Sequence, residues 1–546
     1  MKRNALLSAV LAGLLSLQAA GAAEAPRLVE RDGRHALLVD GKPFLMLGAQ
    51  AHNSSNYPGA LKPVWDAAKD VKANTVLMPV AWEQVEPEEG KFDFSFVDTL
   101  VKEARQQKQR LVILWFATWK NTSAQYTPAW VKLDPKRFPF NVDREGKSNY
   151  SLSPFGTETL KADKRAFVAL MAHLKKIDSA ERTVLMVQVE NEVGTYGLVR
   201  DFGKAAEAAF AQPVPAAVLA RKKAVVPGAA SGNWRAVYGD YADEYFHAWA
   251  IARYIGDIAA AGKAVYDLPM YVNNALRNPL DQPPKPWNKD FASGGPTWDV
   301  IDIYKAAAPA LDIVAPDIYR PESEQVNANL RLFQRVDNAL WVPEIGNAAA
   351  YGRYLYPVLG HGALGVAPFG IDYFNYSNFP LGSTSTDREM VEPFARVFKM
   401  FAPIQRQWAQ WAFDGRTRGA AESDDRKPQL LEFPGWVAKL SYREWQFGET
   451  SWKMTDKFPA GTEQPGGGVA IAQIGDDEFL VIGQRTRVRM EAAPGQNGFM
   501  LRTEQGRFDD QGRWVMERVW NGDQVDYGLN LPAEPVMLKV KMGRPR

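Results

Sequence analysis

The chain has 546 residues, of which 46% are hydrophobic and 23% are charged, an ordinary balance for a globular protein. This length exceeds one typical hydrophobic core, so we expect one large domain and at least one smaller one. The 65 basic and 63 acidic residues nearly cancel, which gives no support for binding to nucleic acid or to an anionic membrane. The absence of cysteine excludes disulfides and zinc–thiolate sites.

The first residues have the pattern of a secretion signal. Lys2 and Arg3 precede an apolar run over residues 5–17, and small residues at 20–22 offer a cleavage site, which predicts a signal peptide over residues 1–23. The run is shorter than the ~20 residues of a membrane-spanning helix. No cysteine is present for lipid attachment. We therefore expect a periplasmic or secreted protein of Gram-negative type, without membrane insertion after cleavage.

Short apolar runs of the kind found in buried parallel strands recur after this segment. Two Asp-Gly turns within residues 27–48 predict a small hairpin that leads into the first of them. The eight strand candidates are residues 44–47, 74–80, 111–116, 183–189, 268–273, 311–316, 340–344 and 363–369. Apolar residues at helical spacing separate them, most clearly over residues 97–108, 159–177 and 243–266.

Eight strands that alternate with helices predict an α/β fold, a (β/α)8 TIM barrel over residues 24–415 that includes the N-terminal hairpin. An open doubly wound sheet is the alternative. The barrel should end in one or two helices over residues 388–413.

From about residue 415 the helical periodicity disappears, and short strand-like runs alternate with Gly and Asp turns. These runs are residues 435–447, 468–475, 478–483, 514–520 and 537–542. They predict an antiparallel β domain over residues 416–546, of sandwich or partial-barrel type. We expect this domain to brace the barrel, in preference to assembling copies of the chain or contacting a polysaccharide.

The chemistry should lie where polar residues end a buried strand. The apolar run 184–189 breaks into Glu190, Asn191 and Glu192. Burying a carboxylate costs several kcal/mol unless it is paired or hydrogen-bonded, and parallel barrels carry their active sites at the carboxyl ends of their strands. We interpret Glu192 as a catalytic acid/base, oriented with Asn191 toward a ligand, and leave Glu190 without a role.

A second carboxylate ends another predicted strand. Apolar residues run into Glu344, which lies on the seventh strand and can face Glu192 on the fourth across the barrel mouth. Retaining glycosidases use two carboxyls ~5–5.5 Å apart, one as acid/base and one as nucleophile. The pair therefore predicts a retaining glycosidase. An inverting hydrolase and a non-catalytic carbohydrate-binding barrel are the alternatives.

Other candidates for sugar binding follow the first and third strands. His52 and Asn53 should lie at the barrel mouth, and Trp119 could stack on a sugar ring or pack in the core. The five histidines are scattered along the chain, so we expect no metal site. The G-x-G-x-x-G match at residues 360–365 precedes a strand instead of following one. We therefore expect no cofactor.

Three stretches resemble a known family. Residues 187–194 (VQVENEVG) are similar to the acid/base signature of glycoside hydrolase family 35, and residues 342–346 (VPEIG) are similar to the nucleophile strand of the same clan. Residues 80–95 resemble the second-strand region that families 35 and 42 share. These families are (β/α)8 retaining enzymes and chiefly β-galactosidases.

The resemblance implies a role for each matching residue. Glu192 would be the acid/base and Glu344 the nucleophile, while Asn191 would bond the sugar 2-hydroxyl. Tyr319, at the end of the sixth strand, would bond and orient the nucleophile. Two positions depart from the family pattern: Val193 stands where a tyrosine is usual, and Thr118 replaces a sugar-binding glutamate.

The chain looks most like the bacterial branch with a short β-type C-terminal domain, some of whose members remove galactose from xyloglucan fragments. The expected partner is therefore an oligosaccharide of plant origin, from which terminal β-galactose is released. Another exo-β-glycosidase is the near alternative. We expect residues 121–155 to roof the pocket, and a homo-oligomer is compatible with the sequence.

Overall fold

The structure is a computed structural model that describes residues 24–222, 228–444 and 462–545. The predicted signal peptide and the last residues of the predicted strand 435–447 lie outside these ranges. Within them, no helix combines the length and the apolar character that a membrane crossing requires.

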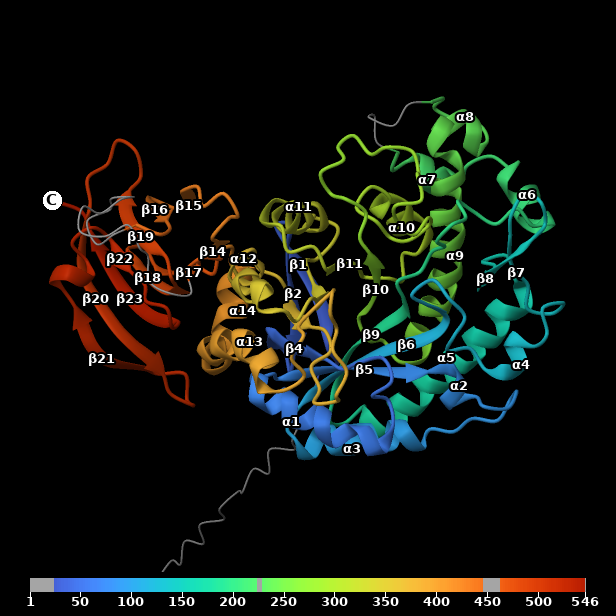
Figure 1. Cartoon of the computed structure of the whole chain (residues 1–546), viewed down its shortest axis with the longest axis horizontal. Coiled ribbons are helices and arrows are strands. Elements are labelled where there is room, and N and C mark those ends of the chain that lie inside the picture. The colour runs from blue at the N-terminus through green and yellow to red at the C-terminus, as the bar shows by residue number, and fades with distance from the viewer. Residues whose placement is uncertain (1–23, 223–227, 445–461, 546) are drawn as a thin grey trace, which may run out of the picture.

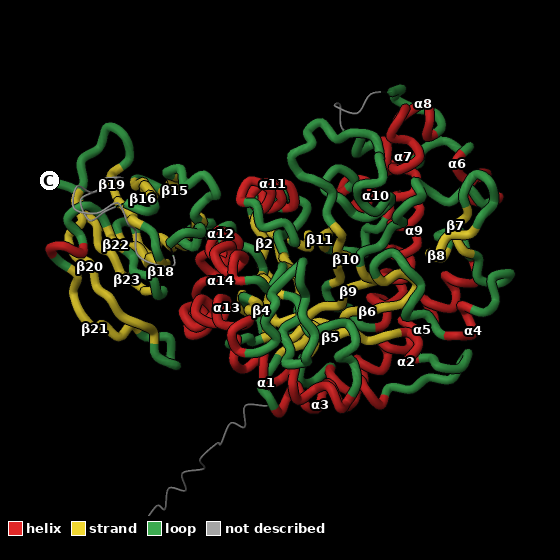
Figure 2. Tube along the Cα trace, in the orientation of Figure 1, coloured by secondary structure: helices red, strands yellow, loops and turns green. Residues whose placement is uncertain are grey.

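Eight parallel strands close into a barrel (Figures 1 and 2). They are β4 (Met46–Gln50), β5 (Thr75–Ala81), β6 (Arg110–Lys120), β9 (Val184–Asn191), β10 (Met270–Ala275), β11 (Ile313–Ile318), β12 (Val342–Ile345) and β13 (Gly365–Pro368). β9 pairs with both β6 and β10, and β13 pairs with β4, so the sheet has no free edge. The predicted (β/α)8 barrel is confirmed, and the open sheet is wrong.

Helices cover the outside of the barrel (Figure 2). The longer ones are α1 (Leu61–Val71), α3 (Ser95–Gln106), α5 (Thr157–Asp178), α9 (Ala242–Val265), α10 (Ile301–Ala307), α11 (Ser323–Phe333), α13 (Arg388–Phe401) and α14 (Gln405–Phe413). Shorter helices are α2 (Trp82–Val85), α4 (Ala129–Lys132), α6 (Lys204–Phe210), α7 (Ala216–Leu219), α8 (Trp234–Tyr238) and α12 (Leu355–Gly360). Short 3-10 helices are η1 (Pro58–Ala60), η2 (Gly239–Tyr241), η3 (Ala349–Tyr354) and η4 (Ala402–Ile404), with η5 (Gly522–Gln524) in the C-terminal part of the chain.

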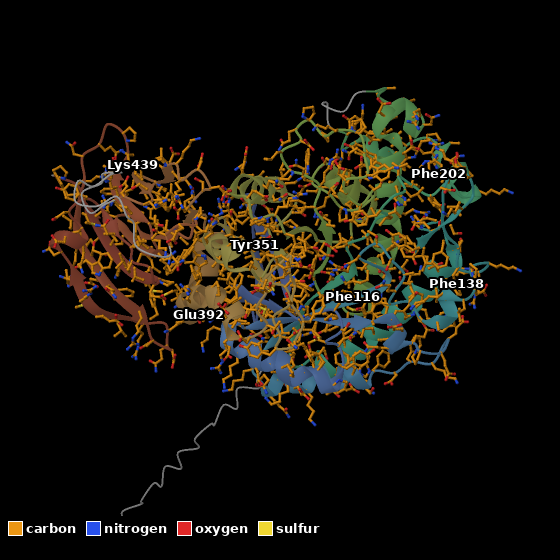
Figure 3. The ribbon with its side chains drawn as sticks, in the orientation of Figure 1. Phe116, Phe138, Phe202, Tyr351, Glu392 and Lys439 are labelled. Atoms are coloured by element: carbon orange, nitrogen blue, oxygen red, sulfur yellow. The ribbon has the colours of Figure 1, made fainter. Side chains whose placement is uncertain are left out.

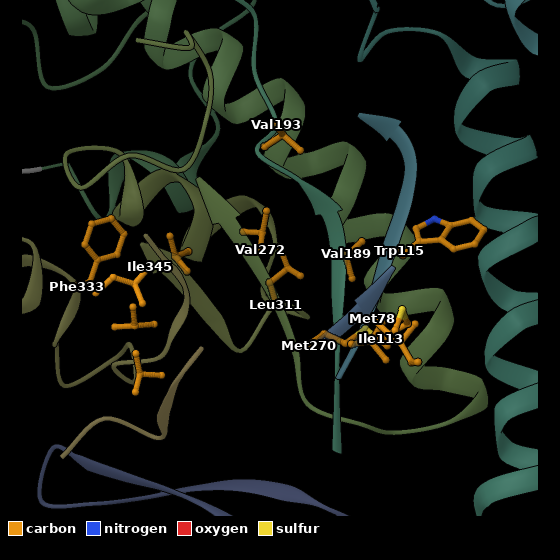
Figure 4. Packing of buried hydrophobic residues seen from close by; sticks show 14 of the residues in the cluster. Met78, Ile113, Trp115, Val189, Val193, Met270, Val272, Leu311, Phe333 and Ile345 are labelled. Carbon is orange, nitrogen blue, oxygen red and sulfur yellow. The ribbon is translucent and has the colours of Figure 1, made fainter. Parts of the chain in front are cut away.

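Alternation along the strands separates the barrel interior from the layer under the helices. In β6, Leu114 belongs to the interior cluster, whereas Ile113 and Trp115 pack toward the helices. Figure 4 shows Trp115 turned toward a long helix. Its indole nitrogen donates a 3.0 Å hydrogen bond to Asp163 of α5. A strand buried on both faces needs apolar residues throughout, which explains the continuous runs in the sequence.

The N-terminal hairpin closes the end of the barrel opposite the strand carboxyl ends. It consists of β1 (Arg27–Arg31), β2 (Arg34–Val39) and β3 (Lys42–Pro43). Leu37 and Phe44 pack with Trp341, which lies just before β12. The hairpin thus seals the amino ends of the strands and leaves their carboxyl ends as the open mouth.

The C-terminal part is an antiparallel β domain of two sheets, as predicted. One sheet has the order β14 (Thr417–Ala421), β17 (Gly468–Gly475), β18 (Glu478–Gln484), β23 (Val536–Gly543), β20 (Phe499–Phe508) and β21 (Trp514–Trp520). The other has the order β15 (Gln429–Phe433), β16 (Trp436–Ser441), β19 (Arg487–Ala492) and β22 (Leu529–Asn530). Buried residues of both sheets, such as Trp436 and Phe479, share one core. β7 (Phe140–Val142) and β8 (Ser148–Leu152) form a separate hairpin above the barrel strands.

The β domain is joined to the barrel by close contacts. Arg353 donates to Asp424 at 2.6 Å and to the carbonyl of Glu422 at 2.8 Å. Figure 3 labels Tyr351 on the barrel side of this junction and Lys439 in the β domain. At the end of α12, Gly360 lies directly against Gly419 of β14, and a Cβ on Gly360 would lie 2.1 Å from the Gly419 nitrogen.

We predict that Gly360→Ala destabilises the junction. Alanine favours a helix by about 1 kcal/mol over glycine, but the added carbon meets backbone that has no room to move. Overpacking of this kind costs about 1–3 kcal/mol. The midpoint of thermal unfolding should therefore fall. Gly59→Ala is the matched control, because a Cβ there meets nothing within 4 Å. An equal midpoint for both variants would contradict the prediction.

Candidate active site

The predicted carboxylates meet at the mouth of the barrel. Glu344 lies in β12, and Glu192 directly follows β9. One carboxylate oxygen from each, together with one from Asp317 of β11, lie within 4.8 Å of one another. So close an approach of the oxygens fits the ~5–5.5 Å between the carboxyl groups of retaining glycosidases better than the ~6.5–9.5 Å of inverting ones. The structure therefore brings together the two groups that the sequence singled out.

Both carboxylate oxygens of Glu344 accept hydrogen bonds. Gln50, at the end of β4, donates from its amide nitrogen to Oε2 at 2.8 Å, and the Tyr319 hydroxyl donates to Oε1. Burial and the charge of Glu344 raise the pKa of Tyr319 well above its usual range, so its hydroxyl keeps its proton. Two donors on separate strands fix the orientation of the Glu344 carboxylate. Tyr319 lies where the family resemblance placed it.

The surroundings of the Glu192 carboxyl favour its protonated form. Desolvation by burial, followed by the negative charge of Glu344, raises the pKa of Glu192 to about 7. Lys120 and a hydrogen bond with Asp317 act in the opposite direction. At neutral or mildly acidic pH, Glu192 can therefore donate a proton.

The backbone around Glu192 adopts a costly conformation. Glu190 and Glu192 both have positive φ angles, 64° and 43°, which side-chain-bearing residues rarely adopt. Three hydrogen bonds hold the turn. The Asn121 amide donates to the carbonyl of Asn191 at 3.2 Å, and the Thr122 amide donates to the carbonyl of Glu192 at 3.0 Å. The Glu192 amide donates to the side-chain oxygen of Asn273 at 3.0 Å.

The remaining predicted contacts lie in different surroundings. Asn191 is fully buried, and neither end of its amide has a partner within the described residues. His52 bonds Asp372 through Nδ1 at 2.9 Å, and its Nε2 has no partner there. The side-chain oxygen of Asn53 is also unpartnered in the described structure. Trp119 has no exposed surface and packs edge-on against Tyr254, with ring centroids 4.8 Å apart.

Thr118 does not face the mouth. Its hydroxyl donates to Asp163 of α5 at 2.5 Å and lies 2.9 Å from the Tyr254 hydroxyl of α9, on the helix side of β6. Lys120 instead brings a charge to the mouth, opposite Asn191 in the pairing of β6 with β9. Burial lowers the pKa of Lys120, while Glu192, Glu344 and Asp317 oppose that shift. The sequence contained a signal for Lys120 that was missed: a lysine at the end of an apolar strand indicates a charge at the barrel mouth.

Sequence reasoning also missed Asp317, Asn273 and Gln50. Asp317 is buried and lies opposite Glu344 in the pairing of β11 with β12. The Asn273 amide nitrogen donates to Asp317 at 2.7 Å, while its oxygen holds the Glu192 amide. Each is a polar residue near the end of a barrel strand, which is the same signal that identified Glu192 and Glu344.

The three mouth carboxyls are also the group of described residues whose spacing could hold a metal ion. Protein donors already occupy oxygens of Glu344 and Asp317: Gln50 and Tyr319 bond the former, and Asn273 bonds the latter. The oxygens are thus oriented by separate strands toward separate donors. This arrangement fits proton transfer and nucleophilic attack.

Comparisons with known proteins agree with this geometry. Residues 65–266 match a family described as beta-galactosidase, glycoside hydrolase family 42, and residues 394–532 match a domain of unknown function, DUF5597. A "Beta-galactosidase" of Xanthomonas manihotis is 29% identical over 204 residues, which cover 36% of this chain and 31% of the relative. The chain thus spans about a third of the length of this curated relative.

Solved structures share the fold. A β-galactosidase from Bacillus circulans sp. alkalophilus has a TM-score of 0.50 at 10% identity, covering 91% of this chain and 99% of its own. One from the psychrophilic Marinomonas ef1 has a TM-score of 0.48 at 11% identity, covering 68% of this chain and 62% of its own. At 10% identity the likeness to the Bacillus circulans enzyme concerns the fold alone. The sequence matches support a glycoside hydrolase of the clan that unites families 35 and 42, and they do not single out family 35.

A second buried carboxyl pair lies behind the mouth. Glu190 accepts a 2.7 Å hydrogen bond from the Trp119 amide and also bonds Asp163. Burial raises the pKa of both carboxyls, and that of Glu190 rises well above its usual range. Two carboxyls in hydrogen-bond contact share a proton. This pair fastens the strained turn to α5.

We predict that Glu190→Gln reduces the pH dependence of stability. Above about pH 4.3, the ordinary carboxyl value, the folded protein holds a proton that the unfolded chain releases, so the free energy of unfolding falls as pH rises. Glutamine can accept from the Trp119 amide and donate to Asp163 without titrating. Chemical denaturation at about pH 5 and about pH 8 measures the change. The wild type should lose more stability than the variant between these values, and equal losses would contradict the shared proton.

Proposed function

We propose that the protein is a retaining, exo-acting β-galactosidase that releases terminal β-galactose from plant oligosaccharides such as xyloglucan fragments. The observation that carries the proposal is the pairing of a protonated Glu192 with a doubly hydrogen-bonded Glu344 at a separation within 4.8 Å. The match of residues 65–266 to a beta-galactosidase family supports the choice of sugar. Export to the periplasm or medium, where such oligosaccharides would be met, is part of the proposal.

The reaction would proceed by double displacement. Glu192 gives its proton to the glycosidic oxygen, the bond from that oxygen to the anomeric carbon breaks, and a Glu344 oxygen bonds the anomeric carbon. The aglycone leaves as an alcohol. Glu192, now a carboxylate, then takes a proton from water, whose oxygen attacks the anomeric carbon and releases Glu344. Asn191, with a free buried amide, would bond the sugar 2-hydroxyl.

A chain segment fixed beside Glu192 supports exo action. The Thr122 amide bonds the backbone of Glu192, and its carbonyl accepts a hydrogen bond from Ser151 of β8. The hydroxyls of Thr122 and Tyr150 lie 3.2 Å apart. The segment 121–155 is thus fastened beside the acid/base. A further aromatic residue, Tyr196, lies near Glu192. Burial and the charge of Glu192 raise the pKa of Tyr196 to about 12.

Substitution of either carboxyl tests the mechanism. Glu344→Gln should reduce turnover of aryl β-galactosides by several orders of magnitude, because no nucleophile remains. Glu192→Gln should spare the first step for an activated dinitrophenyl leaving group and slow the second, so that a burst of phenol precedes slow turnover. Circular dichroism checks that both variants fold. Near-wild-type turnover in either one would refute the assignment. A panel of aryl β-glycosides identifies the sugar, and NMR of the first-formed anomer distinguishes retention from inversion.

The pH profile provides an independent test. The pKa of Glu192, raised to about 7, places the loss of its proton near neutrality. The kcat/KM for a substrate with a sugar leaving group should therefore fall as pH rises above about 7. An activated aryl leaving group needs less protonation, so its profile should fall less steeply. A flat profile to about pH 9 for the sugar leaving group would exclude Glu192 as the acid.

A further inference from the structure

The third carboxyl of the mouth, Asp317, has no part in the two-carboxyl mechanism. It lies in the middle of the site, with one oxygen within 4.8 Å of oxygens from both Glu192 and Glu344. An additional negative charge there would oppose both the ionised nucleophile and the departure of a proton from Glu192. A buried carboxyl at this position therefore requires a physical reason.

The surroundings of Asp317 hold it in one orientation. Its Oδ2 accepts a 2.7 Å hydrogen bond from the Asn273 amide nitrogen. The oxygen of the same Asn273 side chain accepts from the Glu192 backbone amide at 3.0 Å. One asparagine thus fixes Asp317 relative to Glu192. The other oxygen, Oδ1, is buried and accepts from no donor within the described residues. The Asp317 and Glu192 carboxyl groups are nevertheless in hydrogen-bond contact with each other.

The charges around Asp317 favour its neutral form. Glu344 and Glu192 are the acidic groups that face it, and Lys120 is the basic one. The hydroxyls of Tyr319 and Tyr271 also lie near it, and both stay protonated, because burial raises their pKa values well above the usual range. Burial and the charges of Glu344 and Glu192 outweigh Lys120 and raise the pKa of Asp317 well above its usual value.

We propose that Asp317 is a positioning residue that remains protonated and donates its carboxyl hydrogen to one oxygen of Glu192. This inference rests on the proposed function. The other Glu192 oxygen is then the one that carries the catalytic proton toward the glycosidic oxygen. As that proton leaves, negative charge develops on Glu192, and the hydrogen bond from Asp317 becomes stronger. Asp317 keeps its own proton through both steps, so the proton count of the reaction is unchanged.

The experiment compares Asp317→Ala with Asp317→Asn. Asparagine can accept from Asn273 and still donate to Glu192, whereas alanine removes the donor. For a substrate with a sugar leaving group, Asp317→Ala should lower kcat on the order of 100-fold with little change in KM. For a dinitrophenyl β-galactoside the loss should stay below about ten-fold, because that leaving group needs no proton. Asp317→Asn should recover most of the lost kcat.

The pH profile separates a neutral Asp317 from a charged one. Loss of the donor should raise the pKa of Glu192, so the alkaline limb of Asp317→Ala moves up by about one pH unit. The limb of Asp317→Asn should stay within about half a unit of the wild type. If Asp317 were ionised, Asp317→Asn would remove a negative charge and move the limb down, which would overturn the proposal. Equal losses of kcat on both substrates in Asp317→Ala would also overturn it.

An infrared measurement decides the protonation state without turnover. At about pH 8, above the value of about 7 for Glu192, the wild type minus Asp317→Asn difference spectrum should contain the band of a protonated carboxyl. A carboxylate band in its place would refute the proposal. If the wild type hydrolyses no aryl β-glycoside, the proposed function fails, and this spectrum still reports the state of Asp317.

Discussion

Repulsion between buried carboxylates is the constraint on which the mouth of the barrel depends. Two unit charges within 4.8 Å of one another repel by at least roughly 3 kcal/mol at the effective dielectric constant of about 20 that suits protein sites. Three ionised groups would form three such repelling pairs, against which Lys120 brings a single positive charge. The site therefore retains protons. Hydrogen bonds from Gln50 and Tyr319 orient Glu344 as the acceptor, so the protons reside on the other two carboxyls.

The same constraint shapes the strand end that carries Glu192. In a regular strand, residues two apart point to the same face, which would send Glu190 and Glu192 into one crowded site. Their positive φ angles break this alternation. Glu190 turns to Asp163 on the helix side, and Glu192 turns to the mouth. The strain of the turn is offset by hydrogen bonds that the Asn121 and Thr122 amides donate to it and by the one that the Glu192 amide donates to Asn273. The turn thereby keeps the two carboxyl pairs apart.

The fold and the two main site residues could be predicted because their signals are local. Each barrel strand is an apolar run, and Glu192 and Glu344 interrupt such runs. Asp317 interrupts one as well, but its partners come from β9, β10 and β12 and depend on strand register. The strands β14, β15, β19, β20 and β22 went unpredicted because their apolar runs are short. In β15 and β20 the alternation is also blurred, since Leu430, Phe499 and Leu501 are exposed. Thr118 was noted only as a departure from the family pattern, and its direction toward the helices accompanies a register shift in the pairing of β6 with β9.

That direction explains the departure from the family pattern in physical terms. A glutamate on the mouth side of β6 would bring a fourth carboxylate to a site that already holds three. Each further pair of ionised groups would cost roughly 3–4 kcal/mol. This chain instead directs the hydroxyl of Thr118 toward Asp163 and presents the ammonium of Lys120 to the mouth. Lys120 faces the charges of Glu192 and Glu344 and offsets part of them. The direction of Thr118 and the ammonium of Lys120 therefore both limit the negative charge at the mouth.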